Sequence, residues 1–132
     1  MTRGLMRENF PDGTPFEAVI GFSRAVRAGN QVLVSGTAAW DAQRRVPADA
    51  DMYTQTRLAI RQIERALVSA GAKLSDVVRT RIYTVDMDRW EDIARAHREA
   101  FGDIGPAATL VEVTRLAAPE MLVEIEADAV VE

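Results

Sequence analysis

Acidic side chains are concentrated in two segments near the C-terminus, residues 105–116 and 121–128, in which apolar and polar residues alternate. A period of two is typical of strands that bury one face. A face that carries many carboxylates does not form a dry core, so we expect it to meet water, a cationic partner or a ligand. The sequence predicts one face with Val111, Val113, Val123, Ile125 and Ala127, and an opposite face with Leu110, Glu112, Thr114, Glu124, Glu126 and Asp128.

A third alternating segment, residues 77–85, would place cations near these acids. Guanidinium groups bind carboxylates through paired, charge-assisted hydrogen bonds. Arg81 therefore has two interpretations: it forms a salt bridge to Glu112, Glu124 or Glu126, or it binds an anionic ligand. The predicted apolar face carries Val78, Thr80, Ile82 and Thr84, and the predicted polar face carries Arg79, Arg81, Tyr83 and Val85.

His97 is the single histidine, and the chain has no cysteine. It lies between Ile93 and Phe101 on the apolar side of a predicted helix. A packed, hydrogen-bonded ring is therefore favoured over a catalytic base. One histidine and scattered carboxylates do not form a metal ligand set, and no phosphate-binding loop or nucleophile elbow occurs. We expect no metal and no cofactor.

The composition indicates a single soluble domain of 132 residues, because 48% apolar and 27% charged residues are ordinary for such proteins. The net charge of −4 argues against a nucleic-acid partner, which a basic surface would attract. No apolar run approaches the roughly 20 residues of a membrane span, and the first ten residues have no signal-peptide core. We expect a cytoplasmic protein without a membrane partner.

The elements that would position these side chains follow in order. Residues 1–15, rich in glycine and proline, are predicted as an irregular N-terminal arm. Residues 16–20 and 23–28 are predicted as short strands, and Gly29-Asn30 as the turn that leads into a buried strand over 31–36. Gly36 indicates a close approach of backbone, a bulge, or a simple strand exit.

Two helices are predicted between the strands. Asp51 is the expected N-cap of the first and Gly71 its C′ residue, while Arg57, Arg61 and Arg65 are expected in solvent. The second is predicted from an Asp88-x-x-Glu91 capping box to about Phe101. Its expected apolar side carries Trp90, Ile93, His97, Ala100 and Phe101.

The predicted fold class is therefore α+β, with the order β-β-β-α-β-α-β-β and both helices on one face of a mixed sheet. The charged face is left for contact with other copies of the chain.

Four separated segments form a recognisable set of motifs. They are Gly21-Phe22-Ser23-x-Ala25-Val26, Val34-Ser35-Gly36-Thr37, Pro106-Ala107-x-Thr109-x-Val111-Glu112-Val113-x-x-Leu116, and Val123-Glu124-Ile125-Glu126. Together they resemble the Rid family of reactive intermediate deaminases, many of them catalogued as L-PSP endoribonucleases. The resemblance spans about residues 16–130 and implies a single Rid-like domain over 16–132 with a chorismate-mutase-like fold. It also implies a homotrimer with small-molecule clefts between subunits.

The chain departs from the family pattern at two positions. In the family, an arginine after Pro-Ala grips the carboxylate of a 2-imino acid, and a glutamate with backbone groups positions water. Here Ala108 replaces that arginine and offers no donor. Loss of a buried bidentate pair costs about 2–5 kcal/mol of binding. Phe22 stands where the family usually has tyrosine, so the phenolic hydroxyl is absent.

The resemblance implies that Glu124 is the catalytic-site glutamate, a general acid or base. The alternative is an ion pair between Glu124 and Arg79 or Arg81. Under the ligand-binding interpretation, Arg81 supplies the cation that Ala108 lacks, in a relocated pocket. The implied ligand-binding residues are Phe22, Ser35, Gly36, Thr37, Arg81, Tyr83, Ala108 and Thr109.

Three functions follow from this comparison. The first is hydrolysis of an imine or enamine metabolite, in a form unlike standard 2-imino acid deamination. The alternative is non-catalytic binding or sensing of a small ligand. A ribonuclease ranks last, because one histidine and an acidic surface fit phosphate binding and proton transfer poorly.

Overall fold

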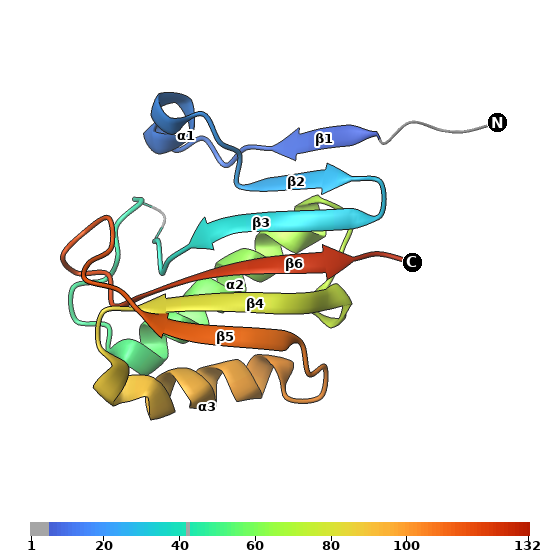
Figure 1. The fold of residues 1–132 in the computed structure, drawn as a ribbon. Coiled ribbons are helices and arrows are strands. Elements are labelled where there is room, and N and C mark those ends of the chain that lie inside the picture. The colour runs from blue at the N-terminus through green and yellow to red at the C-terminus, as the bar shows by residue number, and fades with distance from the viewer. Residues whose placement is uncertain (1–5, 42) are drawn as a thin grey trace.

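The computed structural model describes residues 6–41 and 43–132 and shows one mixed sheet with two long helices behind it (Figure 1). The strand order is β1-β2-β3-β6-β4-β5. The β4–β5 pair is parallel and the other pairs are antiparallel. The predicted α+β class and helix arrangement are confirmed. The strands are β1 (Arg7–Phe10), β2 (Ala25–Ala28), β3 (Gln31–Thr37), β4 (Val77–Thr84), β5 (Ala107–Glu112) and β6 (Val123–Val130).

The helices are α1 (Pro15–Ile20), α2 (Met52–Ser69) and α3 (Trp90–Phe101), with short 3₁₀ turns at Leu74–Asp76 and Met87–Arg89. Asp51 caps α2 as predicted, because its carboxylate accepts a hydrogen bond from the Thr54 N–H at 2.8 Å. Gly71 follows the helix with φ +83°, which favours glycine.

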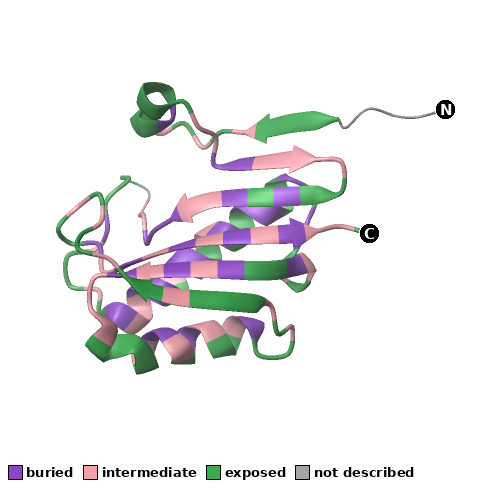
Figure 2. Cartoon of the chain, in the orientation of Figure 1, coloured by how far each residue is buried: buried purple, intermediate pink, exposed green. Residues whose placement is uncertain are grey.

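The core lies between these helices and the sheet. Side chains on β6 alternate between buried and partly exposed along the whole strand, as predicted (Figure 2). The buried members, Val123, Ile125, Ala127 and Ala129, pack with α2 and α3, and their partly exposed neighbours face the open side of the sheet.

The N-terminal predictions require two corrections. Residues 1–5 lie outside the described residues, but Arg7–Phe10 form β1, which pairs with β2 and lengthens the sheet. Residues 15–20 form α1 and not a strand. Pro15 stands at the start of this helix, where its fixed φ is favourable, and Glu17 accepts the Thr14 N–H at 3.1 Å. Five apolar-rich residues were too few to separate strand from helix by periodicity.

The predicted faces of β5 are inverted. Thr109 pairs with Arg81 and Leu110 with Ile82, so Thr109 lies on the open face and Leu110 on the helix face. Glu112 is therefore not among the open-face acids, and its carboxylate accepts the Met87 N–H at 2.9 Å. β5 is an edge strand with both faces partly exposed, so its alternation does not reveal which face is inward.

Two further predictions fail at irregular points. A register shift between Val77 and Arg79 leaves Val78 exposed, and not on the buried face with Thr80. Asp88 lies inside the 3₁₀ turn, which Asp86 caps, so there is no Asp88–Glu91 capping box. α3 consequently starts at Trp90, whose side chain is half exposed.

Candidate functional site

A glutamate packed on a glycine forms the centre of the candidate site. β6 places Glu124 on the open face, paired with Tyr83 of β4. On the other side, β3 has an irregular register between Val34 and Thr37, and Gly36 lies within it. A Cβ atom at Gly36 would lie 3.0 Å from Cδ and 3.2 Å from Oε2 of Glu124. The register shift agrees with the bulge interpretation of Gly36, and the space beside it is occupied by the Glu124 side chain and not by backbone.

The environment of Glu124 raises the pKa of its carboxyl group above the ordinary value. Burial is the main cause, since it disfavours the charged form, and the neighbouring Glu126 carboxylate acts in the same direction. The Arg24 guanidinium opposes both effects by favouring the carboxylate. A partly buried carboxyl group of this kind can exchange a proton with a bound molecule closer to neutral pH.

The neighbouring acids are engaged with Tyr83 and Arg81. The Tyr83 hydroxyl donates to Glu126 Oε1 at 2.7 Å, which raises the pKa of Tyr83. Arg81 Nη1 lies 3.6 Å from Glu126 Oε1 and 3.4 Å from Asp128 Oδ2. The salt-bridge interpretation of Arg81 therefore holds, with Asp128 as an added partner in place of Glu112 and Glu124. Binding of an anionic ligand by Arg81 stays a prediction.

Arg24 is the site residue that the sequence reasoning missed. Its side chain is buried, and Nη1 donates to the Gly36 carbonyl at 2.5 Å and to Thr37 Oγ1 at 3.2 Å. Its Nε donates to Asp12 Oδ2 at 3.0 Å. Thr37, which is itself buried, thus acts as a hydrogen-bond acceptor for Arg24. The sequence does contain a sign of this role, because Arg24 is a charged residue between Ser23 and Ala25, at the start of a predicted strand. A charged side chain buried at such a position needs a partner of opposite charge or hydrogen-bond acceptors.

A second buried acid, Glu17, fixes the chain around Arg24. Its two carboxylate oxygens accept the backbone N–H groups of Asp12, Gly13, Thr14 and Arg24 at 2.8 to 3.2 Å. Four donors satisfy a carboxylate well, so Glu17 has a structural role.

The remaining predicted residues divide between the two faces. Ser35 is tied to the backbone, since its Oγ donates to the Ser23 carbonyl at 2.6 Å. The Phe22 ring centroid lies 5.6 Å from Arg24 Cζ. Ala108 pairs with Thr80, whose side chain is buried beneath the helices, so Ala108 and Glu124 lie on opposite faces of the sheet in one chain. Gly36, Tyr83 and Glu124 are brought together, and Ala108 is not.

His97 belongs to the helix side. Its Nε2 lies 2.9 Å from Thr80 Oγ1, and its ring centroid lies 4.8 Å from that of Phe101. Burial lowers the pKa of His97, which favours the neutral ring. The predicted packed, hydrogen-bonded ring is confirmed. Across residues 6–41 and 43–132, no three acidic or histidine side chains cluster as metal ligands would, and no helix is long and apolar enough to span a membrane.

A mixed sheet with two helices on one face, and a partly buried glutamate packed on a glycine on the other, defines an α+β protein of the YjgF-type, chorismate-mutase-like fold. The chain belongs to the endoribonuclease L-PSP family, which is the Rid family that its motifs resemble. The model of that family matches residues 13–131, which include every candidate residue of the site.

Relatives support this assignment at several levels of similarity. The solved structure of a YjgF/YER057c/UK114 family member from Mycobacterium tuberculosis is 49% identical, with a TM-score of 0.86, and the match covers 96% of this chain and 100% of that one. A RutC family protein of Pyrococcus horikoshii is 34% identical over 82% of this chain and 85% of its own length. A 2-iminobutanoate/2-iminopropanoate deaminase of Salmonella typhimurium is 28% identical over 98% of both chains.

Proposed function

We propose that this chain forms a homotrimer with small-molecule clefts between subunits, in which Glu124 is the general acid–base group that hydrolyses an imine or enamine metabolite. The observation that carries the proposal is the Glu124 carboxyl, packed on Gly36 with a raised pKa. Its support from relatives is the imine deaminase named above, which matches nearly the full chain.

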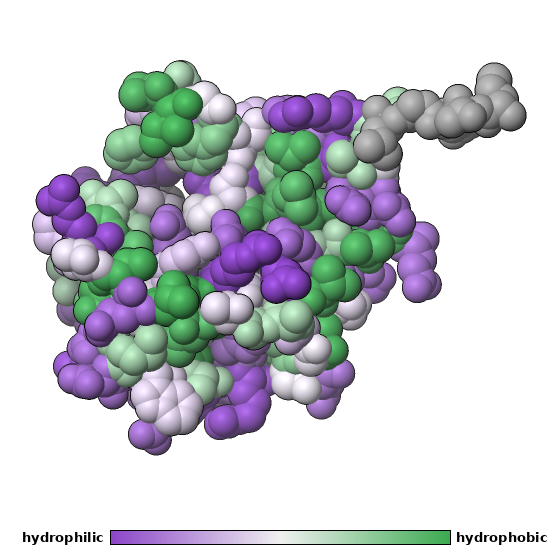
Figure 3. Space-filling model, viewed as in Figure 1, coloured by the Kyte–Doolittle hydropathy of each residue, from purple (hydrophilic) through white to green (hydrophobic). Residues whose placement is uncertain are grey.

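The open face of the sheet favours assembly. Figure 3 shows this face, on which hydrophilic side chains at the centre are bordered by apolar ones. Leu33, which pairs with Asp128, and Val111, which pairs with Tyr83, are exposed there at 45% and 39%. Contact with other copies would bury these side chains and shelter the ion pairs of Arg81 from water.

The position of Ala108 also favours a cleft shared by two chains. Ala108 lies on the edge strand β5, on the helix side, while Glu124 lies on the open side of the sheet. A pocket that contains both positions, as the family resemblance implies, therefore takes Glu124 from one subunit and Ala108 from its neighbour.

The chemistry needs one proton carrier. As water attacks the carbon of the C=N bond, the Glu124 carboxylate accepts a proton from the water. The same carboxyl then donates that proton to the nitrogen, which gives a carbinolamine. In a second transfer the carboxylate takes the hydroxyl proton of the carbinolamine and passes it to the nitrogen, so that the C–N bond breaks, ammonia leaves and the carbonyl product forms. One water is consumed for each imine, and the glutamate ends in its starting state.

The missing arginine sets the expected substrate class. Alanine at 108 offers no cation, and Arg81 is paired with Glu126 and Asp128, so neither position supplies a free guanidinium for a substrate carboxylate within one chain's part of the cleft. We propose that neutral imines or enamines are handled better than 2-imino acids. A bidentate pair between arginine and carboxylate typically contributes about 2–5 kcal/mol of binding free energy, so its absence weakens the binding of anionic substrates strongly.

A non-catalytic binding protein is the second candidate, and the two departures at Phe22 and Ala108 favour it. A metabolite that raises the melting temperature but is never consumed would support binding over turnover.

The test compares hydrolysis of a neutral imine with that of a 2-aminoacrylate-type imine, followed by carbonyl formation. The wild-type chain is expected to accelerate the neutral imine over buffer, Glu124→Gln to abolish the rate, and Glu64→Gln, an exposed acid on α2, to retain it. No rate above buffer with either substrate would exclude the hydrolase proposal in favour of binding.

A further inference from the structure

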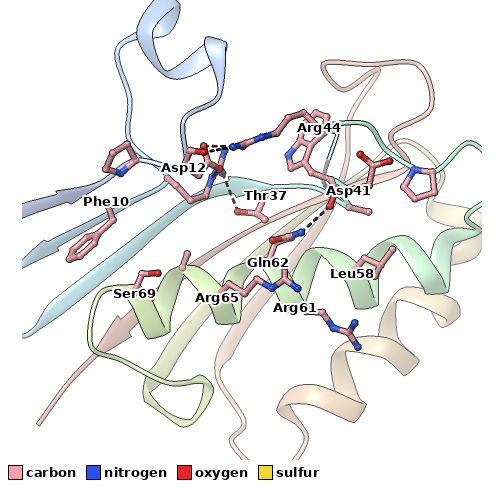
Figure 4. A pocket seen from close by; sticks show the side chains of 16 residues that line it. Phe10, Asp12, Thr37, Asp41, Arg44, Leu58, Arg61, Gln62, Arg65 and Ser69 are labelled. Carbon is pink, nitrogen blue, oxygen red and sulfur yellow. Dashed lines mark hydrogen bonds and ion pairs between the residues drawn. The ribbon is translucent and has the colours of Figure 1, made fainter.

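A cavity lies on the helix side of the sheet, opposite the face that carries Glu124. It has a volume of about 590 Å³ and opens between α2 and the ends of β1, β2 and β3, beside residues 39–47 (Figure 4). Small-molecule sites typically have volumes of roughly 300–1,000 Å³. Arg24 and Thr37 line it as well as belonging to the Glu124 site, but Glu124, Tyr83 and Ala108 do not line it.

The cavity carries a surplus of positive charge in a protein whose net charge is −4. Four arginines line it against two aspartates, and both aspartates already have partners. Asp12 lies 3.0 Å from Arg24 Nε and 3.4 Å from Arg44 Nη1. Asp41 accepts the backbone N–H groups of Gln43 and Arg45, each at 2.9 Å. Arg24 and Arg44 lie beside Asp12, so the two positive charges in excess are assigned to Arg61 and Arg65.

Arg61 and Arg65 stand one turn apart on α2, and Arg57 precedes them at the same spacing. Like charges at i and i+4 repel one another, so this row is unfavourable for the helix. Among residues 6–41 and 43–132, no carboxylate lies within 4.0 Å of either guanidinium, although six other basic residues have such partners. An anion in the cavity would relieve this repulsion.

The other end of the cavity is apolar. Leu58 and Trp40 pack on a buried cluster that includes Ala39, and all three line the cavity. Gln62, between the two arginines, donates its Nε2–H to the Trp40 carbonyl at 2.9 Å, which fixes the loop against α2. Figure 4 shows Gln62 and Arg65 on α2 across the cavity from Asp12 and Thr37. The lining thus combines cations with an aromatic and aliphatic wall.

We propose that this cavity binds a small organic oxyanion, with a phosphate or carboxylate head at Arg61 and Arg65 and an apolar body against Trp40 and Leu58. Guanidinium forks match both kinds of head through paired hydrogen bonds. The wall beside them suits a planar or aliphatic body.

Tryptophan fluorescence tests this proposal, because the chain has two tryptophans and the second, Trp90, lies half exposed on α3. In a Trp90→Phe background, titration with phenyl phosphate at constant ionic strength is expected to change Trp40 emission saturably. Benzyl alcohol, which has the body without the charge, should not saturate. Inorganic phosphate should compete more weakly, because it lacks the body.

The double variant Arg61→Gln, Arg65→Gln is expected to bind phenyl phosphate at least about tenfold more weakly, because it loses the charge-assisted hydrogen bonds to the anionic head. Arg57→Gln is the matched control on the same helix, since Arg57 does not line the cavity. Glutamine and arginine have similar helix propensities, so folding should be preserved, and circular dichroism checks it. Calorimetry on the wild-type chain repeats the titration without the Trp90 substitution.

Equal affinity of the double variant and the Arg57→Gln control would overturn the proposal, as would the lack of saturable binding in the millimolar range. A benzoate titration separates the two heads: tighter binding of phenyl phosphate supports a phosphate ligand, and tighter binding of benzoate supports a carboxylate ligand. Neither result depends on imine hydrolysis, so this proposal can fail while the proposed function stands.

Discussion

The carboxyl carbon of Glu124 lies 3.0 Å from the point where a side chain at Gly36 would begin. Real Cβ contacts essentially never come closer, so the two positions share one space. The contact between Gly36 and Glu124 links β3 to β6 on the open face of the sheet. The partly buried Glu124 carboxyl therefore lies on the face that other copies of the chain are expected to cover.

Gly36→Ala is expected to displace the Glu124 side chain and to lower the free energy of unfolding by about 1–3 kcal/mol, the usual cost of overpacking. Denaturant unfolding measures the change. The backbone at Gly36 is not in the positive-φ region, so the cost should come from the contact.

Glu124→Ala provides the control for this prediction. With the glutamate truncated, Gly36→Ala should cost much less than in the wild-type chain, which gives a coupling energy between the two sites. Additive effects of the two substitutions would contradict the shared-space account.

The raised pKa of Glu124 predicts a pH-dependent stability. Between the ordinary value of 4.5 and the higher folded-state pKa, the folded chain binds more protons at this residue than the unfolded chain. The contribution of Glu124 to the free energy of unfolding is therefore fully present below pH 4.5, and it is lost as the pH rises through the folded-state pKa.

Urea unfolding across this range should show Glu124→Gln gaining stability relative to wild type as pH rises, since glutamine does not titrate. Glu64→Gln, on the exposed side of α2, should show no such trend. If the difference in free energy of unfolding between wild type and Glu124→Gln did not change with pH, the raised pKa of Glu124 would be refuted.

Arg24→Gln should destabilise the fold by about 3 kcal/mol, because it removes the buried partner of Asp12 and leaves the Gly36 carbonyl with one donor fewer. It should also raise the pKa of Glu124 further, since the Arg24 charge opposes the shift. NMR titration of the Glu124 side chain checks the second effect. An unchanged or lower pKa in the variant would contradict it.

Ala108→Arg restores the family's cation at the edge strand. We expect KM for a carboxylate-bearing imine to fall by at least tenfold, within the range that a bidentate pair supplies. The neutral imine serves as the control and should keep its KM. An unchanged KM for the carboxylate-bearing imine would contradict the placement of residue 108 in the cleft.

Strong periodicity made the main elements predictable. The alternation in β6 and the capped, amphipathic α2 both survive in the structure because each has one well-buried face. The strand irregularity at Gly36 was one of the interpretations of that glycine, and the packed ring of His97 was expected from its place on an apolar helix face.

The errors fall where local pattern carries little information. The face of β5 depends on its parallel register with β4, which no feature of an edge strand specifies. Residues 15–20 are too few for a period to show. Arg24 acts through contacts with Asp12 and Gly36, which are distant in sequence and meet only in the folded chain.

Sedimentation equilibrium at micromolar concentration tests whether neighbouring copies of the chain cover the face that carries Glu124, on which the proposed clefts depend. We predict a single species with three times the chain mass of 14.5 kDa. A mass of one chain throughout that range would contradict the trimer, and with it the clefts in which Glu124 is proposed to act.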